Sequence, residues 1–259
     1  MADRIDAFHF GLPERQLFGV FHPARDVTRA AVLMCPPLLH EQVRSYRFFA
    51  GVATLLAESG LACLRFDYFG TGDSGGDSAG FRPAQAGQDI MQAAATLRER
   101  TDGAPLILMG IRASALLAGA QAADAYASAL WLWQPVCDAV AYLDELDALD
   151  AAERGSRLRY PLLEQGPVAE PHELMGFVLA PSFRDELASL GTGVNADGCP
   201  VAVLDIAEAR PGTLHAEARI ALPPAVTDWV GQVEMEGLVP VGAARDAVRT
   251  LVGDLSTWA

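Results

Sequence analysis

The segment LILMGIRASALLAGA, residues 106–120, most constrains what this chain can fold into. An apolar run of strand length leads into a tight turn at 110–114, which we call the elbow turn, and then into a helix of small residues. Such a strand, turn and helix is typical of α/β proteins, and in many enzymes the turn reads G-x-S-x-G and carries a nucleophilic serine. Here the central residue of the elbow turn is Arg112.

Strand and helix patterns alternate on both sides of the elbow turn. The alternation predicts an α/β fold with a mostly parallel central sheet and helices on both faces. An antiparallel hairpin over 8–22 is expected before these alternating elements, and two strands and a closing helix complete the chain. Strands are expected at 30–37, 61–70, 105–110, 128–136, 199–208 and 218–224, and helices at 47–60, 82–100, 113–126 and 242–258.

The length of 259 residues fits one domain over 1–259. Between 138 and 195 the pattern changes, because an acidic helical stretch at 141–155 is followed by a segment rich in proline. We interpret 138–195 as a small helical cap or insertion above the sheet. A plain connecting helix pair fits the same pattern.

The charge balance narrows the class of partner. Nineteen basic and 33 acidic residues give a net charge of −14, and a surface this acidic repels phosphate backbones, so we expect no nucleic-acid partner. The four cysteines are widely spaced without a CxxC pair, and we expect no metal and no cofactor. No run approaches the roughly 20 apolar residues of a membrane span, and the first residues carry no apolar leader, so the expected location is cytoplasmic.

Several segments carry a family resemblance. The turn RFDYFGTGDSGG at 65–76, the elbow turn and the order of elements resemble the α/β-hydrolase superfamily. The segments at 35–50, 110–119, 130–146 and 173–187 resemble, more narrowly, the hydrolase-like proteins associated with exosortase A systems, whose second type carries arginine in the elbow. That resemblance implies the α/β-hydrolase fold and a role beside bacterial exopolysaccharide gene clusters.

The chemistry of the elbow turn excludes a serine-type acyl-enzyme at its centre. Arg112 stays protonated and has no lone pair to donate, and Ser114 falls inside the first helical turn. The family resemblance implies a histidine after the last strand, where this chain reads LPPAVTDW. Neither Asp205 nor Glu208 has an obvious imidazole to orient, and His215 is expected on the surface. The sequence therefore indicates a pseudoenzyme without a Ser-His-Asp triad.

A cation at a helix N-terminus is disfavoured by the helix dipole, so Arg112 should have an anionic partner. One interpretation is a pocket for a carboxylate, phosphate or sulfate group of a ligand. The other is an internal salt bridge to Glu41, Asp67 or Asp138, which a ligand could displace. The predicted ligand-binding residues are Arg112, Ile111, Ala113, His40, Glu41 and Asp138.

Three further side chains are candidates for displaced catalysis beside Arg112. His40 could act as a general base or a ligand donor, and it could equally brace the following helix. Cys35 and Cys137 each end a predicted strand, and either could be a thiol nucleophile activated by His40. Inert buried cysteine is the alternative for both.

Three functions follow from these residues. The first is a protein that binds an anionic small molecule or a carrier-borne acyl group at the elbow turn. The second is a hydrolase or acyltransferase that uses a displaced Cys/His set, and the third is a non-catalytic scaffold. A small-molecule ligand or substrate is the expected partner, and a homodimer is left open.

Overall fold

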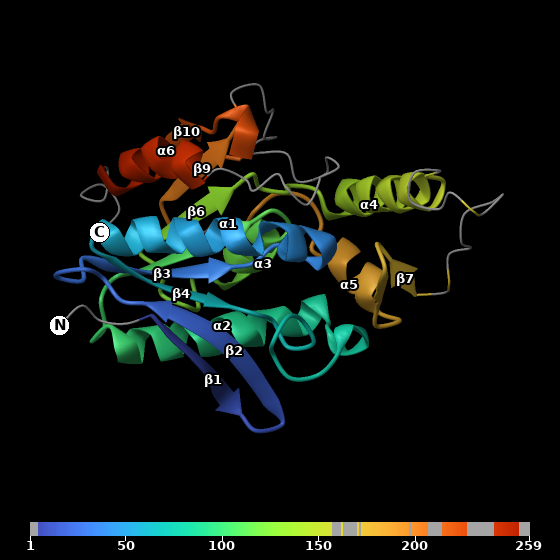
Figure 1. The fold of residues 1–259 in the computed structure, drawn as a ribbon, viewed down its shortest axis with the longest axis horizontal. Coiled ribbons are helices and arrows are strands. Elements are labelled where there is room, and N and C mark those ends of the chain that lie inside the picture. The colour runs from blue at the N-terminus through green and yellow to red at the C-terminus, as the bar shows by residue number, and fades with distance from the viewer. Residues whose placement is uncertain are drawn as a thin grey trace.

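The core of the protein is a twisted eight-stranded sheet (Figure 1). The computed structural model describes residues 5–156, 162, 170, 172–196, 198–206, 214–226 and 241–253. The strand order is β1-β2-β4-β3-β5-β6-β9-β10. These strands are β1 (Asp6–Leu12), β2 (Arg15–His22), β3 (Ala30–Cys35), β4 (Leu61–Phe66), β5 (Leu106–Ile111), β6 (Ala129–Trp133), β9 (Val201–Asp205) and β10 (Ala218–Ala221).

The sheet is mostly parallel, as the alternating pattern predicts. Strands β1 and β2 form the expected antiparallel hairpin, β2 pairs antiparallel with β4, and every other neighbouring pair is parallel. Every residue of β3, β5 and β6 is buried. A parallel strand covered on both faces needs such an uninterrupted apolar run, which explains why these strands were readable from sequence.

Helices cover both faces of the sheet (Figure 1). One face carries α1 (Leu39–Glu58) and α6 (Val241–Gly253), and the other carries α2 (Pro83–Arg100) and α3 (Ser114–Gln121). Helix α1 begins eight residues before the predicted start at residue 47. The buried side chains of its first turns include His40, Glu41 and Gln42, so apolar periodicity gave no helical signal there.

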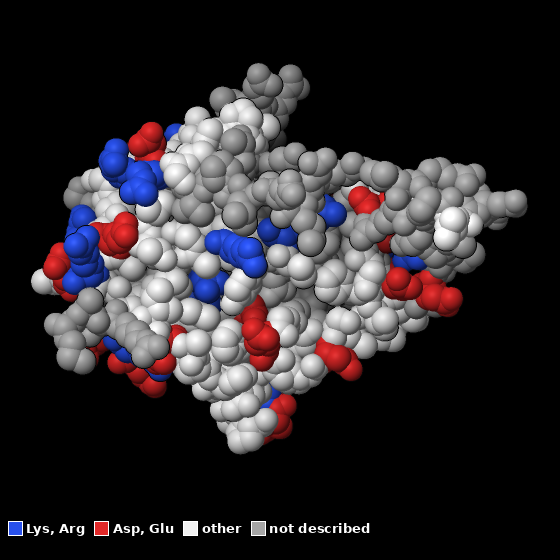
Figure 2. Space-filling view, viewed as in Figure 1, with Lys and Arg blue, Asp and Glu red and all other residues white. Residues whose placement is uncertain are grey.

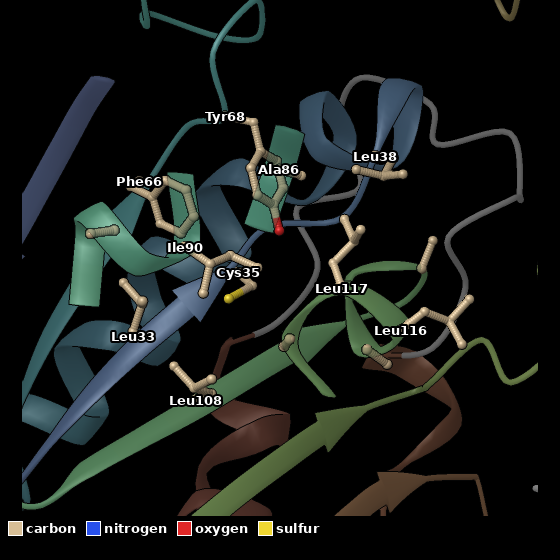
Figure 3. Packing of buried hydrophobic residues seen from close by; sticks show 14 of the residues in the cluster. Leu33, Cys35, Leu38, Phe66, Tyr68, Ala86, Ile90, Leu108, Leu116 and Leu117 are labelled. Atoms are coloured by element: carbon tan, nitrogen blue, oxygen red, sulfur yellow. The ribbon is translucent and has the colours of Figure 1, made fainter. Parts of the chain in front are cut away.

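Each face of the sheet has its own apolar core. Towards α1, the ring of Trp133 packs edge-on against Phe48 and Phe49, with centroid distances of 5.6 and 5.4 Å. Towards α2 and α3, Leu33, Cys35 and Leu108 of the sheet face side chains of the helices, as Figure 3 shows. The sheet is therefore packed between two apolar layers of side chains. Close packing on both faces holds the carboxyl ends of the strands in position.

The predicted insertion contains more than helices. Its described part consists of α4 (Ala139–Arg154), a short hairpin of β7 (Glu173–Leu174) and β8 (Phe177–Val178), and α5 (Phe183–Ala188). Helix α5 packs on the α2 side of the molecule, where the rings of Phe183 and Phe81 lie 6.0 Å apart. Among the described helices, none is both long enough and apolar enough to cross a bilayer.

Candidate functional site

The elbow turn joins β5 to α3 through a strained residue. Arg112 follows the last residue of β5 and has φ 53°, a left-handed conformation that side chains rarely adopt. Its backbone N–H donates to the Trp133 carbonyl at 3.0 Å, and its carbonyl accepts from Ala115 N at 3.0 Å. A Cβ atom on Gly110 would lie 2.7 Å from Cα of Ala115, so glycine is required where strand and helix meet.

The Arg112 side chain forms a buried ion pair with Glu41 of α1. Nε of Arg112 donates to Oε1 of Glu41 at 2.8 Å, and the two side chains are 15% and 2% exposed. Nη1 lies 3.4 Å from the Gln134 carbonyl oxygen, and Nη2 lies 3.8 Å from Oε1 of Glu145. Burial lowers the pKa of Arg112, but the Glu41 carboxylate more than offsets this, so the pKa is raised and the side chain stays charged.

A tyrosine of α4 binds the other oxygen of the Glu41 carboxylate. The hydroxyl of Tyr142 in α4 donates to Oε2 of Glu41 at 2.9 Å. Burial raises the pKa of Glu41, while the Arg112 guanidinium and the Tyr142 hydroxyl oppose that rise. Both carboxylate oxygens of Glu41 therefore have partners, one from the elbow turn and one from α4.

Two more strained residues flank this pair. Leu39, which opens α1, has φ 54°, and Gln134, which follows β6, has φ 44°. Together with Arg112 they come from three separate segments at the carboxyl ends of β3, β5 and β6. Backbone strain of this kind concentrates at functional sites, because elsewhere it is a cost without a benefit.

His40 lies beside the ion pair in an unsatisfied environment. The residue is 7% exposed, and neither ring nitrogen has a hydrogen-bond partner among the described residues. Burial lowers its pKa to about 4, with Arg44 and Arg112 contributing in the same direction. The imidazole is therefore neutral near pH 7, and no described carboxylate orients it as a triad would.

The two candidate thiols occupy different surroundings. Cys35 is fully buried, and burial raises its pKa to about 12. Cys137 is partly buried, and burial raises its pKa too. Its Sγ lies 3.9 Å from the Pro135 carbonyl oxygen. Neither sulfur reaches a nitrogen of His40, whose ring nitrogens have no described partner. These properties count against a thiolate nucleophile at either position.

The other candidate carboxylates for Arg112 serve local structure. Asp67 accepts from Nε2 of Gln42 at 2.8 Å and from the backbone N–H of Asp73 at 3.0 Å. Asp138 caps α4 by accepting from the backbone of Val140 and Ala141. Of the three carboxylates considered in sequence, only Glu41 therefore pairs with Arg112.

The remaining predicted residues fall as follows. The side chains of Ile111 and Ala113 are buried. The Ser114 hydroxyl is buried and hydrogen-bonds to the Tyr68 hydroxyl and the Pro36 carbonyl, away from Arg112. His215 is a surface residue, with its side chain 89% exposed.

The acid and histidine positions of a triad are only partly described. Asp205 ends β9, and its Oδ1 accepts from the backbone N–H of Ile206 at 2.8 Å. Glu208, Thr227 and Asp228 lie outside the described residues. Across the described ranges, no group of three or more His, Cys, Asp or Glu side chains is arranged to hold a metal ion.

Comparisons with solved structures give the same architecture over nearly the whole chain. A carboxyl esterase from Bacillus coagulans aligns with a TM-score of 0.60 at 12% identity, covering 98% of both chains. A putative hydrolase from Agrobacterium vitis aligns at 0.55 and 16% identity, covering 96% of this chain and 98% of its own. The chain has the α/β-hydrolase fold. No family model and no curated protein matches its sequence.

Within the α/β-hydrolase fold, sequence reasoning missed three contributors to the site. Tyr142 and Glu145 lie in α4, and Gln134 contributes a backbone carbonyl after β6. A polar residue at the end of an apolar parallel strand was a usable signal for Gln134. Nothing in the local sequence of α4 indicates which of its residues faces Glu41, because that depends on how α4 packs against α1.

Proposed function

We propose that this chain is a non-catalytic α/β-hydrolase-fold protein that binds an anionic small molecule or a carrier-borne acyl group at Arg112. The observation that carries the proposal is the orientation of the guanidinium. Oε1 of Glu41 accepts from Nε at 2.8 Å, while among the described residues Nη1 and Nη2 have only the longer contacts of 3.4 and 3.8 Å. The paired terminal nitrogens match a carboxylate or phosphate group, which an arginine binds in bidentate fashion.

Glu145 supports this assignment as a displaceable partner. Its side chain is 53% exposed, and an exposed ion pair contributes little free energy. Replacing Glu145 at Nη2 by a ligand anion therefore costs little. Glu41, in contrast, is buried and held by Tyr142, so it keeps the guanidinium in position. The strained backbone at Leu39, Arg112 and Gln134 supports a binding site at the same strand ends.

A chemical argument favours binding over acyl-enzyme chemistry. The guanidinium of Arg112 has no lone pair for nucleophilic attack, and Ser114 is turned into the core. His40 is neutral and has no carboxylate partner among the described residues. A displaced Cys/His set stays the alternative, and no contact of Cys35 or Cys137 with another described residue supports it.

The cellular role follows the sequence resemblance. The segments that resemble the second type of exosortase-associated hydrolase-like proteins include Arg112 and the first half of α4. We therefore place the protein in an exopolysaccharide or other biosynthetic pathway, in the cytoplasm. All four cysteines are free thiols, which is the usual state in a reducing compartment.

The test is calorimetric titration with two defined probes, succinate and inorganic phosphate. Glu145→Gln removes the competing carboxylate and should tighten binding by about twofold to fivefold. Asp144→Asn changes charge equally on the neighbouring exposed position of α4 and should leave affinity unchanged. The double variant Arg112→Gln with Glu41→Gln avoids an unpaired buried charge and should abolish binding.

Two results would contradict the proposal. Equal affinity of both probes for the native protein and for the double variant would place the anion elsewhere. Covalent labelling of the native protein by a serine-directed fluorophosphonate, mapped by mass spectrometry, would show a nucleophilic hydroxyl and therefore catalysis. Absence of binding by either probe, with the fold intact, would favour the scaffold function.

A further inference from the structure

A stripe of positive charge runs along α1 and starts at the buried ion pair. Glu41, in the first turn of α1, pairs with Arg112. Arg44 and Arg47 follow within the next two turns, and with His40 they are spaced i, i+4 and i+7, so the three side chains lie along one face of the helix. After Glu41, no acidic residue follows in α1 until its last position. The charge of this stripe is therefore not cancelled within the helix.

The stripe is continuous with the candidate anion site. Burial lowers the pKa of His40, and Arg44 and Arg112 act in the same direction, so both cations lie close to this imidazole. Glu153, near the end of α4, acts on the same pKa in the opposite direction. The positive field at the elbow turn therefore extends past His40 along α1 and does not end at the ion pair.

Arg47 forms the outer end of the stripe, and it is exposed to solvent. No described residue forms a salt bridge or hydrogen bond with its guanidinium. Val43, one helical turn earlier, is 68% exposed and places a small apolar surface beside it. The N–H donors of Arg47 can therefore bind an anion without displacing a described carboxylate.

The charge of the stripe is opposite in sign to the net charge of the chain. The sequence contains no lysine, so every blue side chain in Figure 2 is an arginine. Blue side chains lie over the middle of the face along which α1 runs in Figure 1, while acidic side chains in that view lie mainly toward its margins. On a chain with a net charge of −14, this local excess of positive charge attracts anions that the rest of the surface repels.

The helix sets the spacing between the two ends of the stripe. The rise of an α-helix places Arg47 about 9 Å along the axis from Glu41. Nε of Arg112 lies 2.8 Å from Oε1 of Glu41, so the guanidinium of Arg112 stands at the start of this length. A ligand that binds both arginines therefore needs two anionic groups about 10 Å apart.

We propose that the ligand of the Arg112 site is an elongated dianion, whose second anionic group binds Arg47. This inference rests on the anion binding at Arg112 proposed above. The chain between the two groups passes over the first turns of α1, where Arg44 adds positive charge and Val43 offers an apolar contact. A long dicarboxylate and a carboxyl-ended acyl group on a phosphate-bearing carrier arm share this chemistry.

The test measures how the effect of Arg47 depends on the length and charge of the ligand. Calorimetric titration of the full chain at low ionic strength uses succinate, adipate, suberate and sebacate. The monomethyl ester of sebacate is the matched probe, because it keeps the length and the apolar chain and lacks one charge. Arg47→Gln should weaken sebacate binding by about threefold to fivefold. It should change binding of the ester and of succinate by less than about twofold, because neither brings a second charge to Arg47.

Two further variants and one further probe make the test specific. Arg29→Gln removes an exposed arginine beside the opposite end of α1, where the backbone N–H of residue 29 donates to the Gly60 carbonyl, and should leave every affinity unchanged. Arg47→Lys should keep part of the sebacate affinity, because a cation is retained. Replacing one carboxylate of sebacate by a phosphonate distinguishes the two sources, since tighter binding indicates a phosphate and weaker binding a carboxylate as the second group.

Failure of this inference and failure of the proposed function give different results. Equal sebacate affinity for the native protein and Arg47→Gln, or equal loss of sebacate, ester and succinate in that variant, would overturn the dianion and leave the Arg112 site standing. Binding of succinate and sebacate to the double variant Arg112→Gln with Glu41→Gln at native affinity would overturn both. Circular dichroism of each variant confirms that the fold is kept.

Discussion

Nε of Arg112 lies 2.8 Å from Oε1 of Glu41, and this contact joins the elbow turn after β5 to α1 across 71 residues of chain. The guanidinium stands at the turn before α3, where the helix dipole disfavours a cation. Glu41 supplies the compensating charge from the first turn of α1, and Tyr142 holds the carboxylate from α4. Three elements thus meet at one buried ion pair, and the predictions below test what it contributes.

Removing one charge of the Arg112–Glu41 ion pair should destabilise the protein. Arg112→Met leaves the Glu41 carboxylate buried without its partner, and Glu41→Gln leaves the guanidinium in the same state. Each single change should lower the free energy of unfolding by about 3 kcal/mol. The measurement is denaturant unfolding followed by circular dichroism.

The double variant Arg112→Met with Glu41→Gln is the control for this ion pair. Because it removes both charges, its loss of stability should be smaller than the sum of the two single losses by about 1–3 kcal/mol. Strict additivity would mean that Arg112 and Glu41 do not interact in solution.

The buried histidines should make stability fall in mild acid. Burial lowers the pKa of both His22 and His40 to about 4, from 6.5 in an unfolded chain. Between these values the unfolded chain binds protons that the folded chain refuses, so their contribution to stability falls as pH falls from 6.5 to 4. Denaturant unfolding measured at several pH values reports this slope.

Variants separate the histidines from carboxylates that titrate nearby. Burial raises the pKa of Glu41 and Asp67, which opposes the slope in the parent protein. His40→Gln and His22→Gln should each flatten the fall relative to the parent. His215→Gln should not, because that side chain is 89% exposed. An unchanged slope in the His40 variant would mean that this residue is solvated in the folded protein.

Removing the hydroxyl of Ser114 should affect stability alone. Ser114→Ala removes the buried hydroxyl that hydrogen-bonds to the Tyr68 hydroxyl and the Pro36 carbonyl, at a cost of about 1–3 kcal/mol. Succinate affinity should not change, because Ser114 is turned away from Arg112. A turnover of p-nitrophenyl acetate that is present in the parent and lost in this variant would instead identify Ser114 as a nucleophile.

The elbow turn should not tolerate a methyl group at its first glycine. In Gly110→Ala the new Cβ meets Cα of Ala115 at 2.7 Å and the Ser114 carbonyl oxygen at 2.9 Å, and neither backbone atom can move freely. The expected loss is about 2–3 kcal/mol in thermal or denaturant unfolding. Gly242→Ala in α6 is the matched control, since nothing lies within 4 Å of its new Cβ and stability should hold or rise by up to about 1 kcal/mol.

Most of the fold could be predicted from local sequence patterns, because the central strands are buried on both faces and are therefore apolar throughout. Uniformly apolar runs mark β3, β5 and β6, and small residues mark the packing of α3 on β5. The start of α1 was placed too late because its buried first turns are polar. The hairpin of β7 and β8 was missed because each strand has two residues, too few for an alternating pattern.

The sequence by itself determined that a permanent cation, Arg112, occupies a tight turn bounded by small residues at the end of a buried parallel strand. That follows from residue chemistry and local sterics alone. Only the tertiary structure decided that Glu41, and neither Asp67 nor Asp138, neutralises this cation. The reason is that all three carboxylates lie near the same strand ends, and the choice among them depends on ångström-scale distances set by how α1 and α4 pack on the sheet.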